Sequence, residues 1–144
     1  MSHPADPTTD PAGQPRTGPP DVVVPALALT RVGIGIGLLV SPVGLARGLG
    51  IDAETARRVG WMARMAGARE VALGLGCLQA WRRGDALDGW VAGQALSDGV
   101  DAVAFAVTAA RGDVGPVRGW ALSLFAASGA VAEAVTAARL RATP

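Results

Sequence analysis

The sequence lacks lysine and tyrosine entirely, and it contains one histidine, His3, and one cysteine, Cys77. A catalytic triad, a histidine metal site, a Schiff-base lysine and a P-loop lysine each need one of these scarce residue types within a folded segment. A single cysteine excludes an internal disulfide framework, and Cys77 stands in an apolar run with no histidine to activate it. We therefore expect no metal, no cofactor and an inert packing thiol.

The charge balance excludes a further class of function. Thirteen arginines face twelve acidic residues in a chain of 144 residues, for a net charge of +1, and the arginines form no basic block. Nucleic-acid-binding domains carry a strongly basic face, so we expect no nucleic-acid partner. The length allows one domain.

The first 21 residues differ in composition from everything that follows. They hold six prolines among threonine, aspartate and glycine, and such a composition buries too little apolar surface to offset the entropy of ordering. The stretch has no positive region leading directly into a short apolar core, which a secretory signal needs. We expect residues 1–21 to form a disordered tail and residues 22–141 to form the folded domain.

Four apolar segments follow the tail, and about 20 apolar residues are enough to span a bilayer as a helix. They cover residues 22–46, 59–81, 89–110 and 119–138. Each is interrupted by charge, so hydropathy alone does not establish the spans. The first connection between segments, residues 47–58, contains Asp52, which we expect to cap a helix that begins near residue 53.

Tryptophan placement favours a membrane. Each of the four tryptophans lies within about three residues of a segment end, where interfacial aromatic belts are found. A soluble core would use large aromatic residues at helix centres as readily as at helix ends. The four are Trp61, Trp81, Trp90 and Trp120.

Glycine placement points the same way. A glycine costs roughly 1 kcal/mol in a water-exposed helix, whereas in lipid small residues let helices approach closely. Two G-x-x-x-G pairs and one heptad-spaced trio stand within the segments: Gly33 with Gly37, Gly89 with Gly93, and Gly60 with Gly67 and Gly74. We therefore predict an all-α protein, a four-helix transmembrane bundle in contact with the lipid bilayer.

The orientation of such a bundle is not decided by its arginines. Five arginines border the segments on the side of the termini and five on the other side, so the positive-inside rule gives a tie. We expect a multi-pass protein of the plasma membrane with cytoplasmic termini, because the polar tail then need not cross the bilayer.

Seven ionisable residues lie within the proposed spans: Arg31, Arg64, Arg69, Glu70, Asp98, Asp101 and Glu133. Each would cost about 2.5 to 3.5 kcal/mol at the centre of a lipid-facing helix. They must therefore face one another or a wet cavity. Three positive and four negative groups nearly cancel, which favours a shared network between helices.

Helical spacing indicates which of these groups face inward. Gln94, Ser97, Asp98 and Asp101 follow the i, i+3, i+4, i+7 pattern and form one polar stripe on an apolar helix.

On the second segment, Arg64 and Arg69 are about 140° apart and Glu70 is about 100° from Arg69. The three cannot all point at one partner, so we expect Arg64 to reach the interface and either Arg69 or Glu70 to face the interior.

The inward-facing acids have two interpretations. Asp98 and Asp101, with Glu70, could act as catalytic acid and base, while Arg69, Arg31, Gln94 and Glu133 bind a substrate. Alternatively, Asp98 and Asp101 pair with Arg69 or Arg31 and fix the helix register. Glu133 could pair with Arg139 or, across the bundle, with Arg31.

The run from Arg64 to Gly76, RMAGAREVALGLG, followed by Asp98-Gly-Val-Asp101, resembles the small four-span membrane proteins of actinobacteria and fungi that are grouped as a domain of unknown function. Those proteins are DoxX-like in size and layout. The resemblance covers about residues 22–139 and implies four membrane helices with Arg69, Glu70, Asp98 and Asp101 at motif positions. It implies no activity.

Three classes of function remain open. The first is a structural or accessory membrane component, acting alone, as a homo-oligomer or within a larger membrane assembly. The second is a membrane enzyme of the isomerase or cyclase type that acts on a lipophilic small molecule through Asp98 or Asp101. The third is a proton-linked carrier of small molecules, in which the same acids load and release protons.

Overall fold

The computed structural model describes residues 19–142, and within that range it is all-helical, as the sequence predicts. Residues 1–18 of the predicted tail lie outside the described residues, whereas Pro19 and Pro20 already belong to the first helix. The five helices are α1 (Pro19–Val40), α2 (Pro42–Gly48), α3 (Ala53–Arg83), α4 (Asp88–Arg111) and α5 (Pro116–Ala142).

The first predicted segment, residues 22–46, is not one helix. Helix α1 ends at Val40, and a separate short helix, α2, begins at Pro42. Proline has no amide hydrogen to continue the ladder, and its ring disfavours helical backbone at the preceding residue. Ser41 accordingly has a φ of −134° and a ψ of 57°. The Ser41-Pro42 pair was the signal in the sequence for this break.

The remaining helix ends follow local rules. Asp52 caps α3 as predicted, because its carboxylate accepts hydrogen bonds from the backbone amides of Glu54 and Thr55 at 3.0 Å each. Gly84 and Gly112 end α3 and α4 with left-handed backbone, at φ values of 71° and 75°. Pro116 opens α5, a position where its missing amide hydrogen costs nothing.

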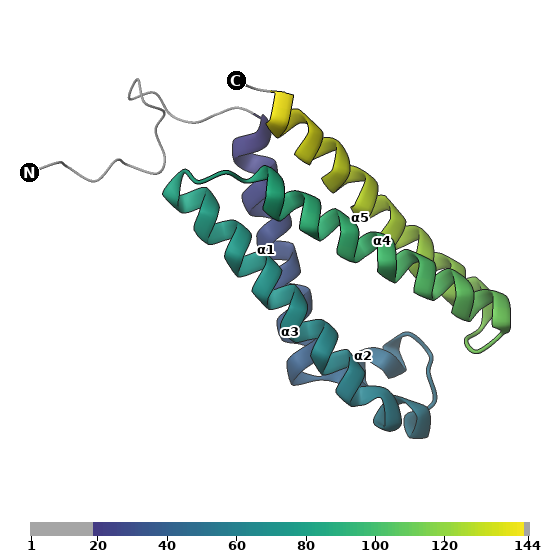
Figure 1. Ribbon diagram of the computed structural model, residues 1–144. Helices are drawn as coiled ribbons and strands as arrows, with labels where there is room; N and C mark the ends of the chain where they lie inside the picture. The colour runs from purple at the N-terminus through teal and green to yellow at the C-terminus, as the bar shows by residue number, and fades with distance from the viewer. Residues whose placement is uncertain (1–18, 143–144) are drawn as a thin grey trace, which may run out of the picture.

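The helices form two antiparallel hairpins. Helix α1 packs along α3, with α2 against the same helix, and α4 packs along α5. Figure 1 shows the two hairpins together near the C-terminus and diverging towards α2 and the α4–α5 turn. At the divergent end the Arg118 guanidinium reaches the Gly50 carbonyl oxygen at 3.4 Å.

The hydrophobic core lies at the end where the hairpins meet. Val24 and Ala28 of α1 pack there with Cys77, Val91 and Ala137 from the other three long helices. Eight of the eleven buried hydrophobic residues in the described chain are alanines. Small side chains therefore fill the interior, and Cys77 is 1% exposed, as expected of a packing thiol.

Glycine explains how closely α1 and α3 approach. A Cβ atom at Gly67 would lie 2.7 Å from the Gly35 carbonyl oxygen, and one at Gly74 would lie 2.7 Å from the Ala28 carbonyl oxygen. Two members of the predicted heptad trio on α3 therefore mediate close contact with α1, whereas the third, Gly60, lies at an ordinary distance from Val43 of α2. The predicted G-x-x-x-G pairs do not: Gly33, Gly89 and Gly93 have no other atom of the described chain within 4 Å of an added Cβ.

Two of the helices are long and apolar enough to cross a membrane by length and composition. They are α1, over residues Val22–Val40, and α5, over Pro116–Ala142. Among the described residues, α3 and α4 do not meet this criterion, because charged residues interrupt them.

Candidate functional site

Six charged side chains from all four long helices meet at the middle of the bundle. Arg31 comes from α1, Arg69 and Glu70 from α3, Asp98 and Asp101 from α4, and Glu133 from α5. We call this group the ionic cluster. Each member lies well inside its helix rather than at a helix end.

Arg31 is the centre of the ionic cluster and is 5% exposed. Its Nη1 contacts the Glu70 carboxylate, and its Nη2 lies 2.7 Å from Asp98 Oδ1. Glu133 accepts from Nε at 3.0 Å and from Nη2 at 2.9 Å, a two-pronged contact. The same Nη2 also donates to the Gln94 carbonyl oxygen at 3.3 Å. One guanidinium group therefore links α1 to the other three long helices.

Arg69 forms the outer part of the ionic cluster. Its Nη2 lies 3.1 Å from Glu70 Oε1 and 2.5 Å from Asp101 Oδ2, and its Nη1 donates to Asp101 Oδ1 at 3.3 Å. Of the two residues expected to face the interior, Glu70 is buried, whereas Arg69 is partly exposed and reaches the ionic cluster through its guanidinium group. The long arginine side chain bridges the roughly 100° that separates neighbouring residues on a helix.

The other charged residues of the predicted spans either pair with an arginine of the ionic cluster or lie on the surface. Arg64 is exposed and lies outside the ionic cluster, as expected. Glu133 pairs across the bundle with Arg31. Asp98 pairs with Arg31 and Asp101 with Arg69, so both proposed arginine partners are used.

The α4 stripe also contributes uncharged polar groups. Gln94 is fully buried, and its side-chain nitrogen donates to the backbone carbonyl oxygen of Leu73, in α3, at 3.3 Å. Its side-chain oxygen and the Ser97 hydroxyl are buried with no hydrogen-bond partner within the described part of the chain. The stripe therefore faces the other helices, as its spacing predicts.

Gly129 is a residue of the site that the spacing argument missed. A Cβ atom at this position of α5 would lie 2.4 Å from Asp98 Oδ2. The absence of a side chain therefore makes room for the Asp98 carboxylate between α4 and α5. The signal available in the sequence was a glycine one helical turn before Glu133.

The charges in the ionic cluster do not balance. Two guanidinium groups face four carboxyl groups, because Arg64 stays outside.

The ionic cluster has a buried part and a partly exposed part. Glu70 and Glu133 are 7% and 2% exposed, whereas the side chains of Asp98, Asp101 and Arg69 are 21%, 33% and 37% exposed.

Three of the carboxylates lie close enough to share a cation. Glu70, Asp98 and Asp101 each offer an oxygen within 4.8 Å of the others. Each of these carboxylates is already in contact with Arg31 or Arg69. Their arrangement is that of a salt-bridge network.

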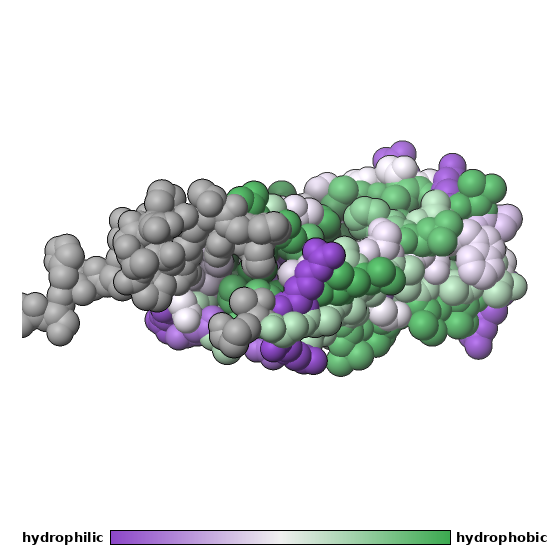
Figure 2. All heavy atoms as spheres, turned by 90° about the horizontal axis from the view of Figure 1, so that it is seen from above, coloured by the Kyte–Doolittle hydropathy of each residue, from purple (hydrophilic) through white to green (hydrophobic). Residues whose placement is uncertain are grey.

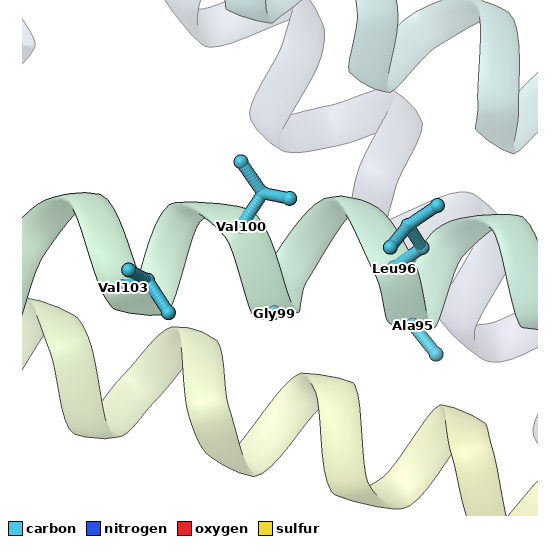
Figure 3. A pocket seen from close by; sticks show the side chains of 5 residues that line it. All are labelled: Ala95, Leu96, Gly99, Val100 and Val103. Atoms are coloured by element: carbon cyan, nitrogen blue, oxygen red, sulfur yellow. The ribbon is translucent and has the colours of Figure 1, made fainter.

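Two surface hollows lie along α4. One, of about 400 Å³, is lined by five residues of α4, Ala95, Leu96, Gly99, Val100 and Val103 (Figure 3). The other, of about 450 Å³, lies beside the α3–α4 turn and is lined by Leu73, Ala86, Asp88, Gly89, Trp90 and Gly93. Both are shallow and open, and neither is lined by a residue of the ionic cluster.

Two carboxyl groups at helix starts have lowered pKa values. Hydrogen bonds from Thr55, followed by that from Glu54, lower the pKa of Asp52. A hydrogen bond from the Arg141 guanidinium, at 3.0 Å, lowers the pKa of Asp88. As anions, Asp52 and Asp88 stabilise the starts of α3 and α4, because the N-terminal end of a helix dipole is positive.

Comparison with known proteins adds no relative: no family model, no curated protein and no solved structure matches the chain.

Proposed function

We propose that the protein is an integral membrane component of four spans, in which the ionic cluster fastens the two helical hairpins together. The observation that carries the proposal is the reversed distribution of polarity. Charged side chains such as Arg31 and Glu133 lie inside, whereas large apolar side chains lie outside.

The outer surface has the composition expected of a lipid-facing one. Val117, Phe125, Leu124 and Leu96 are 82%, 68%, 69% and 71% exposed. Figure 2 shows hydrophobic residues over most of the visible described surface, with hydrophilic ones in small groups. Soluble monomers rarely expose such extensive apolar surface, and buried charges paired with one another are typical of membrane interiors.

The depth of the tryptophans agrees with the proposal. Trp61 and Trp81 are 20 positions apart on α3, which at 1.5 Å per residue is about 30 Å, the thickness of the hydrocarbon layer. Trp61 and Trp90 are 60% and 40% exposed, as residues of an interfacial belt would be. Glu70 lies almost midway between Trp61 and Trp81, so the ionic cluster would lie near the bilayer centre.

Four of the five charged residues within residues 59–81 and 89–110 belong to the ionic cluster. Arg69, Glu70, Asp98 and Asp101 would not bring unpaired charge into lipid, because they pair with one another and with Arg31. Low hydropathy therefore does not argue against four spans here, since insertion is penalised chiefly by unpaired charge.

The contacts of the carboxyl groups in the ionic cluster favour a structural role, in which the cluster joins the two hairpins, over catalysis. Every carboxyl group of the ionic cluster contacts a guanidinium group, and neither hollow is lined by Asp98 or Asp101. We propose that Arg31 and Arg69 hold the hairpins in register and that the protein acts as a structural or accessory component of the plasma membrane.

Membrane extraction tests the proposal. We expect the full chain to stay in the pellet after washing with high salt and with alkaline carbonate, and to be released by detergent. Recovery in the carbonate supernatant would contradict it.

The orientation of the protein in the membrane is tested separately by cysteine labelling. The native Cys77 is 1% exposed, so it should not react with the label. With cytoplasmic termini, a membrane-impermeant maleimide applied to intact cells should label Asp113→Cys, in the α4–α5 turn, and not Asp85→Cys, in the α3–α4 turn. The reverse pattern would invert the orientation without removing the four spans.

A further inference from the structure

Helix α4 has an outward face that the rest of the described chain leaves uncovered. Its residues recur at alternating spacings of four and three, as on the side of a helix that packs along another helix. They are Gly89, Gly93, Leu96, Val100, Val103 and Val107, which we call the α4 seam. The four large side chains of the α4 seam are 43% to 71% exposed, so one copy of the described chain leaves this apolar face open.

The two surface hollows along α4 both lie on the α4 seam. Leu96, Val100 and Val103 line one of them (Figure 3), and Gly89 and Gly93 line the other. An added Cβ at either glycine would meet no other atom of the described chain within 4 Å. In lipid, small residues let a neighbouring helix approach closely, and here the described chain supplies no such neighbour. The α4 seam therefore has the ridge and the hollows of a helix contact whose second helix belongs to another molecule.

The length of the α4 seam matches the thickness of a bilayer. From Gly89 to Val107 it covers 18 positions, which at 1.5 Å per residue is about 27 Å, against about 30 Å for the hydrocarbon layer. Given the proposed membrane placement, on which this inference rests, the helix that packs on the α4 seam is itself a membrane-spanning helix.

The distribution of charge indicates which helix that is. Within residues 89–107 the charged residues are Asp98 and Asp101, and both lie on the opposite side of α4, where they pair with Arg31 and Arg69. The α4 seam therefore matches a seam that is equally uncharged, and it offers no ion pair to a helix that carries a charge within the membrane. Two copies joined at their seams would also keep the surplus negative charges of their ionic clusters apart. We propose that the α4 seam joins two copies of this chain in a symmetric dimer.

The order of side chains along the α4 seam fits two parallel strands. In heptad notation Val100 and Val107 take position a and Leu96 takes position d, and β-branched residues at a with leucine at d favour a dimer. Copies inserted in the same orientation are parallel, so each residue meets its own counterpart across the two-fold axis. Gly89 and Gly93 then let the two helices approach most closely at the end beside the α3–α4 turn.

Disulfide cross-linking of the full chain in isolated cell membranes, with a membrane-permeant oxidant, tests the proposal. We expect V100C to form a disulfide-linked dimer, because position a of one copy meets position a of the other. The native Cys77 is buried and should not contribute. The matched control is Val131→Cys, which is also exposed but lies on α5, where Gly119 and Gly129 already face atoms of α4 in the same chain. It should stay monomeric.

A bulky residue in the α4 seam should separate the copies without disturbing either one. We expect Gly93→Leu to lower the dimer association constant, measured from the cross-linked fraction of V100C, by about tenfold or more through overpacking. Gly33→Leu on α1 is the control, because an added Cβ there also meets no other atom of the described chain within 4 Å. It should leave the cross-linked fraction unchanged, and equal losses in the two variants would contradict the proposed interface.

The remaining outcomes separate the dimer from the proposed function. A V100C dimer no stronger than that of Val131→Cys, in a chain that resists carbonate extraction, would overturn the dimer and leave the proposed function intact. Release of the chain by carbonate would overturn the proposed function itself. A V100C adduct with a mass other than twice that of the chain would show that a different membrane protein covers the α4 seam. If V100C does not fold, L96C in the adjacent layer should cross-link in its place, and its failure to do so would count equally against the dimer.

Discussion

Arg31 is the residue whose loss should matter most to folding. Removing one partner of a buried ion pair leaves an uncompensated charge and costs about 3 to 5 kcal/mol, and here three carboxylates would lose their common partner. We predict that R31Q lowers the thermal midpoint of the protein in detergent severely, whereas R64Q, at an exposed position of α3 outside the ionic cluster, changes it little. Equal effects would mean that the ionic cluster does not hold the hairpins together.

Asp52 gives a pH-dependent prediction. The folded-state pKa of this N-cap lies below its unfolded value of about 4. Its contribution to stability is therefore fully present above the unfolded value and is lost as the pH falls through the folded one. We predict that D52A melts earlier than the unmodified protein at neutral pH and that the difference disappears in strong acid.

The control for this effect is D113A, which removes an exposed carboxyl group from the α4–α5 turn. It should shift melting little at any pH. A D52A penalty that grows on acidification would contradict the capping role.

Helix α3 depends on glycine where it packs against α1. At Gly67 an added Cβ would lie 2.7 Å from the Gly35 carbonyl oxygen and 2.8 Å from Leu38 Cβ, and overpacking of this kind costs about 1 to 3 kcal/mol. We predict that G67A destabilises the α1–α3 hairpin, seen as a lower thermal midpoint in detergent. G93A, on an open face of α4, should be neutral or stabilising by up to about 1 kcal/mol.

A reversed order of these two variants would show that α4 and not α3 provides the close helix contact. The G-x-x-x-G pattern in the sequence favoured α4 and the second half of α1 equally, because spacing alone does not identify the neighbour that a glycine meets.

The whole molecule is predicted to be apolar outside and polar inside, which cysteine labelling can test in vesicles. Val131 is 64% exposed at the middle of α5, and Cys77 is buried. We predict that a membrane-impermeant maleimide labels Val131→Cys only after detergent is added. Asp85→Cys, in the exposed turn after α3, should react without detergent in the fraction of molecules whose turn faces the outer solution. Labelling of Val131→Cys in intact vesicles would place α5 in water.

The sequence by itself determined the helical class, most helix ends and the inward direction of the charges. Glycine, proline and the Asp52 cap act through backbone neighbours a few residues away, and charges on apolar helices must find partners wherever the helices lie. The same local rule explains why the first predicted segment forms two helices, since Pro42 divides the segment that apolarity alone made continuous.

Only the tertiary structure decided which partners meet. Arg31 with Glu133, Arg69 with Asp101, and Gly67 with Gly35 join residues on different helices, and their pairing depends on how two hairpins cross. The structure also gathered four carboxyl groups around two guanidinium groups in one ionic cluster. Periodicity fixes the face on which a side chain lies, whereas its neighbour is fixed by packing between helices distant in sequence.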